Sequence, residues 1–163
     1  MLPTTTAYAR NAIFSGLWPD EIAKKYPDYW VHDDEEGKKN NFEKDLFQKL
    51  LNRKGLDYKF SYNKVFNSDH GENVISKLSN YYKNDINLIV FNFIDMLSHA
   101  RTDQRMIKEL AKDEAAYRSI TKSWFEHSSL KKLLTELSNS NAKVVITTAV
   151  SYTHLTLPTT SRV

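Results

Sequence analysis

The sequence contains no cysteine, which excludes disulfide bonds and thiolate chemistry. Only 4 of its 163 residues are glycine and 4 are proline. No glycine-rich phosphate loop of the P-loop or dinucleotide-binding type is present. No apolar run approaches the roughly 20 residues of a membrane-spanning helix. Nothing resembles a signal peptide, so we expect a cytoplasmic protein without membrane insertion.

The composition indicates a globular protein with a packed core and a surface exposed to water. Hydrophobic residues make up 40% of the chain and charged residues 26%, and there are 3 Trp, 9 Tyr and 8 Phe. This length suits one core and about one domain. The net charge is +3 and charges of both signs are interspersed, which is typical of an ordinary solvated surface and not of a protein that reads duplex DNA.

Hydrophobic periodicity predicts alternating helices and strands. We expect helices at about residues 7–14, 19–25, 42–52, 73–82, 102–110, 114–125 and 128–139, and strands at 58–66, 88–94 and 143–148. Residues 29–41 are expected to form a polar loop, in which the acidic run 33–36 is solvated. Helix and strand alternate, so the fold class is α/β with a mostly parallel sheet.

The most informative stretch is 87–101, where a buried strand gives way to a polar cluster. The apolar run from Leu88 to Ile94 is typical of a strand buried on both faces. Asp95 follows at once, and ligand sites of open α/β sheets lie at the carboxyl ends of strands. His99 comes four residues later, so helical spacing brings it to the same side as Asp95. The pair can bind a cation such as zinc, or Asp95 can simply cap the next helix.

A run of hydroxyl residues at 4–6 precedes the first expected helix. A threonine at a helix N-terminus can be an activated nucleophile, because free N–H groups there stabilise an alkoxide and an incoming phosphate. Simple N-capping is the alternative. A second Asp-His pair, Asp69-His70-Gly71, is expected in a loop, and His32 and His127 are expected at the surface.

The residues after Thr148 differ abruptly from the rest. Residues 150–159, Val-Ser-Tyr-Thr-His-Leu-Thr-Leu-Pro-Thr, resemble one reading frame of a transposon adapter used to prepare sequencing libraries. We therefore expect residues 1–149 to form one partial domain and 150–163 to be a non-native tail, excluded from reasoning about the fold.

Two segments resemble the PglZ domain, a branch of the alkaline phosphatase superfamily, and in particular its form in PorX-type response regulators of Bacteroidetes. One is 2–17, Leu-Pro-Thr-Thr-Thr-Ala-Tyr-Ala-Arg-Asn-Ala-Ile-Phe-Ser-Gly-Leu, and the other is 90–102, Val-Phe-Asn-Phe-Ile-Asp-Met-Leu-Ser-His-Ala-Arg-Thr. Weaker matches at 116–119 and 123–125 follow in the same order. The resemblance implies a three-layer α/β sandwich of the alkaline phosphatase type, incomplete at both ends.

The same resemblance implies roles for single residues. Thr6 occupies the position of the nucleophile and also of a metal ligand, while Asp95 and His99 resemble the Asp and His that hold one of two zinc ions. Arg10 and Asn11, in the nucleophile segment, are candidates for binding the substrate. The implied substrate is a phosphodiester or a nucleotide-like molecule. Further metal ligands of the family are missing here, so we expect residues 1–163 to be inactive.

Two functions fit this resemblance. The first is a metal-dependent phosphodiesterase or phosphatase, and the second is a signalling module whose metal is structural. In either case the implied partners of the intact protein are a sensor histidine kinase and components of type IX secretion. We also expect residues 1–163 to aggregate or stay partly molten, because strands predicted at the edges of the sheet lack neighbours.

Overall fold

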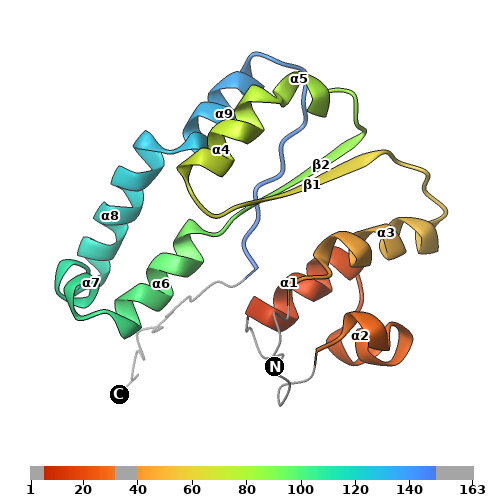
Figure 1. Ribbon diagram of the computed structural model, residues 1–163, viewed down its shortest axis with the longest axis horizontal. Coiled ribbons are helices and arrows are strands. Elements are labelled where there is room, and N and C mark those ends of the chain that lie inside the picture. The colour runs from red at the N-terminus through yellow and green to blue at the C-terminus, as the bar shows by residue number, and fades with distance from the viewer. Residues whose placement is uncertain (1–5, 32–39, 150–163) are drawn as a thin grey trace, which may run out of the picture. The chain divides into compact units, whose positions relative to one another are not determined.

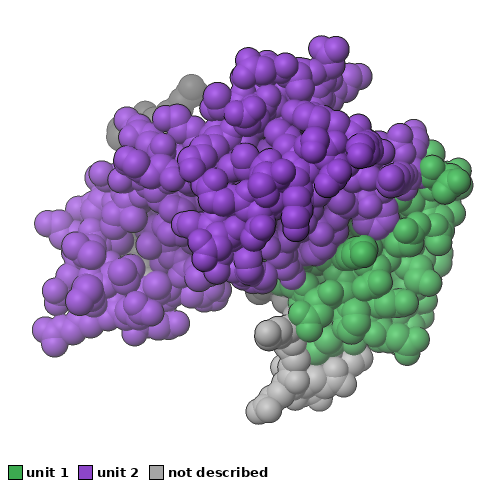
Figure 2. All heavy atoms as spheres, turned by 45° about the horizontal axis from the view of Figure 1, so that its top comes forward, with its two compact units in different colours: residues 1–57, 145–163 green, residues 58–144 purple. Residues whose placement is uncertain are grey.

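The computed structural model describes residues 6–31 and 40–149. The chain divides into two compact units, one formed by residues 1–57 and 145–163 and the other by residues 58–144 (Figure 2). We call them unit 1 and unit 2 and describe each by itself.

All the regular elements in the described part of unit 1 are helical (Figure 1), whereas its residues 145–149 form no helix or strand. Its elements are α1 (Thr6–Ser15), α2 (Pro19–Lys25), the 3-10 turn η1 (Pro27–Tyr29) and α3 (Glu43–Lys54). Helix α1 packs against both α2 and α3. The buried apolar side chains at this junction include Phe14, Ile22, Leu46 and Leu51. These elements confirm the expected helices at 7–14, 19–25 and 42–52, whereas the loop 29–41 falls largely on residues 32–39, outside the described part.

Glycine and proline set the ends of these helices, as their chemistry predicts. Pro19 occupies the first turn of α2, where no N–H is needed, and Asp20 and Glu21 follow in the same turn. Gly16 has φ 62° and Gly55 has φ 66°. Both glycines adopt the left-handed conformation that residues with a Cβ atom disfavour, and they end α1 and α3.

Unit 2 contains a two-stranded parallel sheet among its described residues. Strand β1 (Phe60–Val65) pairs with β2 (Ile86–Phe91), with Phe60 opposite Ile86 and Val65 opposite Phe91. Helices α4 (Ser68–Ser76) and α5 (Leu78–Tyr81) connect the two strands, as parallel pairing requires. The parallel pairing is compatible with the α/β class, and a sandwich of three layers is not established by two strands.

Four helices follow β2 in unit 2. They are α6 (Phe93–Asp103), α7 (Arg105–Leu110), α8 (Glu114–His127) and α9 (Ser129–Ser138). Helix α9 packs beside α4 (Figure 1), and Leu133 of α9 shares a buried core with Val65 of β1 and Val74 of α4. Polar side chains begin the last two helices: Asp113 Oδ1 accepts a hydrogen bond from Ala116 N at 2.8 Å, and Ser128 Oγ accepts one from Lys131 N at 3.3 Å.

The strand predicted over 88–94 was wrong at its end and in its burial. β2 ends at Phe91, and the apolar residues Phe93 and Ile94 belong to α6 instead. The backbone turns at Asn92, which is αR in conformation and whose N–H donates to Val65 O at 3.1 Å. An apolar run of this length does not distinguish a strand from a helix, so the boundary was invisible in the sequence. β2 is only half-buried, with Asn87 exposed.

The helical boundaries on either side of β2 also differ from the prediction. The expected helix 73–82 begins five residues earlier and is interrupted at Lys77. The expected helix 102–110 is two helices, because α6 already starts at Phe93 and the backbone is extended at Gln104. Residues 68–72 were predicted as a loop because they are polar, but they are helical. Polar composition is ambiguous here, because the side chains that cap helices are polar as well.

Asp69-His70-Gly71 lies in the first turns of α4 and not in a loop, so that prediction was wrong. Asn67 caps this helix, with its Oδ1 accepting a hydrogen bond from His70 N at 2.9 Å. Turn-forming residues were taken as a sign of a loop, but Asn is equally favoured as a helix N-cap.

The strand predicted at 143–148 is also wrong. Residues 142–148 have no assigned secondary structure, and Val145 is 88% exposed and Ile146 75% exposed. β-branched residues favour a strand only where a neighbouring strand and a covering layer are present. Within residues 6–31 and 40–149, only β1 and β2 pair with each other.

Among the described residues, no helix is both long and apolar enough to span a bilayer.

Candidate functional site

Asp95 lies where the end of β2 passes into α6. The strand ends at Phe91, Asn92 is the residue before the helix, and Asp95 falls in the first turn of α6. A carboxylate is favoured in this turn, because the free N–H groups of a helix N-terminus give it positive character. The helix therefore begins at the carboxyl end of the strand, where open α/β sheets place their ligands.

His99 lies one turn further along α6, beside Asp95. Its Nε2 is 3.7 Å from Asp95 Oδ1. The side chains of His99 and Asp95 are 72% and 41% exposed respectively, so both are in contact with solvent. The expectation that helical spacing brings these two residues to the same side is confirmed.

The two donor types fit a zinc ion. Carboxylate oxygen and imidazole nitrogen are ordinary zinc ligands, and two such atoms on one tetrahedral ion lie about 3.4 Å apart. The 3.7 Å separation is close to that value, so one ion could bridge the pair with little movement of either side chain. Within the described part of the chain, no group of three or more His, Asp or Glu residues is arranged to hold a metal. The pair by itself offers two donor atoms, which is fewer than the four ligands of a structural zinc site.

Thr6 is the first residue of α1 in unit 1. Its side chain lies outside what the structure describes, as do Thr4 and Thr5. Helix α1 is ten residues long, which gives its N-terminus the free N–H groups and dipole that favour a phosphate. Thr6 belongs to unit 1 and the Asp95–His99 pair belongs to unit 2, and each is described within its own unit.

The other two residues predicted in the nucleophile segment are buried. Arg10 is 7% exposed and Asn11 is 3% exposed. Arg10 Nη2 donates to Glu43 Oε2 at 2.8 Å, and the guanidinium and carboxylate form an ion pair between α1 and α3. In this structure Arg10 is engaged by Glu43.

Glu43, the buried partner of Arg10, was not identified as a candidate residue from the sequence. It opens α3, and its side chain is fully buried. A glutamate in the first turn of an amphipathic helix is ordinarily read as a solvated residue that favours the helix dipole. The sequence carried no signal of its burial, because the partner Arg10 lies 33 residues away.

The remaining histidines of the described part, His70 and His127, contact residues of their own surroundings in unit 2. His70 is exposed on α4 with its ring edge-on to Phe66, the centroids 6.0 Å apart. His127 Nδ1 lies 2.8 Å from Ser123 O within α8. His32 and the acidic run 33–36 lie outside the described residues.

A comparison with models of protein families matches residues 1–150 to PglZ, described as the BREX system PglZ alkaline phosphatase-like domain. The chain belongs to the PglZ family. The match covers all of unit 2 and the described residues of unit 1, including the start of α1 and the Asp95–His99 pair. A comparison with curated proteins found no match.

Membership of the PglZ family gives these residues a common setting. An alkaline phosphatase-like domain is a phosphatase-superfamily fold. The matched residues include both the helix that begins at Thr6 and the Asp95–His99 pair after β2.

Proposed function

We propose that this PglZ domain is a metal-dependent phosphodiesterase or phosphatase in which Thr6 is the nucleophile. The observation that carries the proposal is the Asp95–His99 pair, which faces solvent at the carboxyl end of β2 within an alkaline phosphatase-like domain. Zinc is the metal whose ligand preferences this pair meets best.

The proposed reaction is an in-line displacement in two steps. The Thr6 hydroxyl oxygen attacks phosphorus, the P–O bond to the leaving alcohol breaks, and the proton of Thr6 passes to the leaving oxygen, which leaves a phosphorylated threonine. Water then attacks the same phosphorus and the bond from Thr6 Oγ to phosphorus breaks. One proton of this water returns to Thr6 Oγ, and phosphate or a monoester is released. The N–H groups at the start of α1 stabilise the charge on the phosphoryl oxygens. Bound zinc would supply electrostatic stabilisation of the attacking and leaving oxygens.

The chain's own residues divide this work. Asp95 and His99 would hold one ion, and Thr6 would contribute its hydroxyl to the metal centre as well as to the reaction. Arg10 and Asn11 stay candidates for binding substrate, although the side chain of Arg10 is occupied by Glu43. The proposed substrate is a phosphodiester or a nucleotide-like molecule, and the proposed location is the cytoplasm.

The finer family assignment is part of the same proposal. The segments at 2–17 and 90–102 support a PorX-type response regulator, in which the domain is the output part of a two-component system. A sensor histidine kinase and components of type IX secretion would then be partners of the intact protein.

The test uses the protein expressed from the reading frame that contains residues 1–148, with whatever sequence that frame supplies on either side. We call it the reading-frame protein. With zinc and bis(p-nitrophenyl) phosphate, we expect hydrolysis that Thr6→Ala lowers by about a thousandfold or more. The circular dichroism spectrum should not change, and zinc should stay bound through Asp95 and His99 although it loses the Thr6 hydroxyl. Unchanged hydrolysis in Thr6→Ala would remove Thr6 as the nucleophile.

A second function is favoured by one observation on unit 2. Met96, Met106 and Leu110, on α6 and α7, are 51%, 73% and 60% exposed. Exposed methionine and leucine side chains suit a surface that contacts a partner protein. If the domain acts only through contacts, Thr6→Ala will leave signalling output intact, whereas Met106→Lys with Leu110→Lys will abolish it.

A further inference from the structure

A buried ion pair in unit 1 involves Arg10, which lies one turn of α1 after the proposed nucleophile Thr6. The side chain of Glu43 is 0% exposed and that of Arg10 is 9% exposed, and Arg10 Nη2 donates to Glu43 Oε2 at 2.8 Å. The pair joins the first turn of α3 to α1, and the proposed reaction makes no use of the Glu43 carboxylate.

The position of the pair along α1 is informative. Arg10 is four residues after Thr6, which is about 6 Å along the axis of an α-helix. Glu43 therefore holds α1 one turn from the residue that must attack phosphorus. A helix frays at its ends unless it is held there. A contact at Arg10, one turn from the N-terminus of α1, therefore fixes the position of the first turn.

Stability alone does not account for a charged pair at this place. Removing a carboxylate and a guanidinium from water is costly, and apolar residues of similar volume often hold two helices together as well or better. A charged pair of fixed geometry does, however, define one relative position of its two helices. Two helices held by apolar contacts alone can slide along each other more easily, because apolar contacts are not directional.

We propose that Glu43 is a positioning residue: through the Arg10 guanidinium it fixes the first turn of α1, and with it Thr6, for attack on phosphorus. This inference rests on the proposed function, since it assigns Glu43 a part in that same site. It also gives the buried Arg10 a role, which is to link the Glu43 carboxylate of α3 to α1.

Unit 1 supplies its own control for this proposal. Arg53 of α3 donates through Nη2 to Ser15 O at 2.6 Å and to Gly16 O at 3.5 Å. This contact joins the same two helices at the opposite end of α1, about 14 Å along the axis from Thr6. Losing it weakens the contact between α1 and α3 without releasing the turn that carries Thr6.

The experiment compares three variants of the reading-frame protein with zinc and bis(p-nitrophenyl) phosphate. Glu43→Gln removes the charge, Glu43→Asp keeps the charge but withdraws the carboxylate by one methylene, and Arg53→Met removes the control contact. For each, the thermal midpoint, the zinc content, kcat and KM are measured. The Asp variant keeps the proposal testable if the Gln variant fails to fold.

We expect both Glu43 variants to lower kcat by about tenfold or more, because small displacements of a reacting group are costly. KM should stay within about twofold, as it does when an interaction matters only in the transition state. Arg53→Met should lower the thermal midpoint by a similar amount and keep kcat within about twofold of the unsubstituted protein.

Three results would overturn the assignment of Glu43. The first is a folded Glu43 variant with unchanged kcat. The second is an equal loss of kcat in Arg53→Met, which would make the pair merely structural, and the third is a rise in KM alone, which would place Arg10 on the substrate. Thr6→Ala separates these outcomes from failure of the proposed function. If it leaves hydrolysis unchanged, or if the unsubstituted protein has none, both proposals fall together.

Discussion

Gly71 of α4 and Ser129 of α9 approach so closely that a Cβ atom on Gly71 would lie 1.8 Å from Ser129 Oγ and 2.4 Å from Ser129 Cβ. Real side chains never come so near, so α4 and α9 pack at this distance only because residue 71 has no side chain. Both residues are buried, and the core residues Val74 and Leu133 lie on the same two helices.

Gly71→Ala should therefore destabilise unit 2 by about 1–3 kcal/mol, the usual cost of overpacking a core. Alanine favours a helix more than glycine does, so any loss of stability arises from the clash and not from helix propensity. Urea denaturation followed by circular dichroism measures the change. Adding Ser129→Gly should recover part of the loss, and an alanine variant as stable as the original would contradict the contact.

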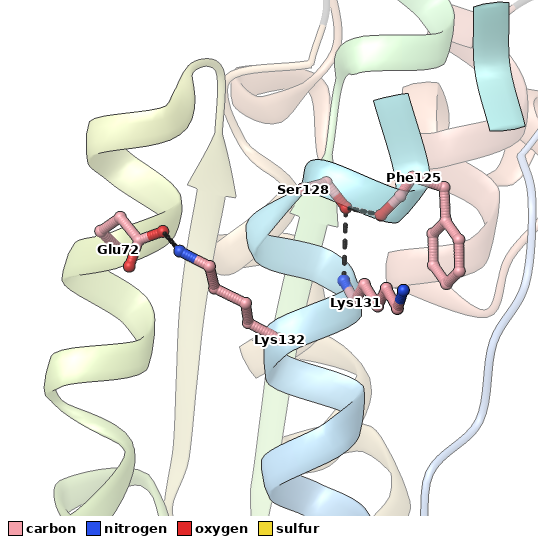
Figure 3. Close-up of polar contacts among 5 residues, drawn as sticks. All are labelled: Glu72, Phe125, Ser128, Lys131 and Lys132. Carbon is pink, nitrogen blue, oxygen red and sulfur yellow. Dashed lines mark hydrogen bonds and ion pairs between the residues drawn. The ribbon is translucent and has the colours of Figure 1, made fainter. Parts of the chain in front are cut away.

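The N-cap of α9 and a nearby surface ion pair should differ in their effect on stability (Figure 3). Ser128 Oγ donates to Phe125 O at 2.8 Å and accepts from Lys131 N at 3.3 Å, and the residue is buried. Ser128→Ala should cost about 1 kcal/mol, as the loss of an N-cap does. Lys132 Nζ lies 2.5 Å from Glu72 Oε1, but both side chains are more than half exposed.

Lys132→Met should therefore change the free energy of unfolding by less than about 0.5 kcal/mol, despite the short distance. The two variants lie in the same helix and can be compared by the same urea titration. A larger loss in Lys132→Met than in Ser128→Ala would mean that solvent does not screen the ion pair. The stability of the unsubstituted protein would then change little as the salt concentration is raised, because salt screens shielded ion pairs much less than exposed ones.

The sequence predicted those parts of the fold that depend on local chemistry. Pro19 began a helix, Gly16 and Gly55 ended helices, and the spacing of Asp95 and His99 placed them side by side. Each of these outcomes follows from residues within one or two turns of each other. Periodicity also identified β1 and β2, whose parallel pairing follows from the helices between them.

Part of what the sequence did not predict depended on distant partners. Asn67 is an exception, because its cap of α4 is local, but Asn suits a turn and a helix N-cap equally. Residues 143–148 were read as a strand, and the structure assigns them no secondary structure. The burial of Glu43 depends on Arg10, 33 residues earlier. Neither local propensity nor periodicity contains such information, because both describe a segment without its surroundings.

Residues 144–146 should promote self-association. Val145 and Ile146 are 88% and 75% exposed, and Val144 is 47% exposed. An exposed apolar segment rich in β-branched residues readily pairs with another chain. Val145→Thr with Ile146→Thr should lower light scattering at a given protein concentration and leave the thermal midpoint unchanged. Val65→Thr, a buried control, should instead lower the midpoint.

The Asp95–His99 pair should be a zinc ligand, and α4 offers a matched control for it. Asp69 and His70 are also a neighbouring Asp and His at an exposed helix start, but they lie in α4. In the reading-frame protein, Asp95→Asn with His99→Ala should lower zinc affinity by about tenfold or more, because it removes two donors at once.

Asp69→Asn with His70→Ala should leave zinc binding unchanged, although it removes the same number of charges and imidazoles from the surface. Titration with a zinc indicator in buffer without phosphate measures both affinity and stoichiometry. Equal losses in the two double variants would mean that zinc binds exposed histidines without selection. A loss confined to the Asp69–His70 variant would mean that zinc binds at α4. Asp95 would then have only the role that its place in the first turn of α6 explains, which is a favourable interaction with the helix dipole.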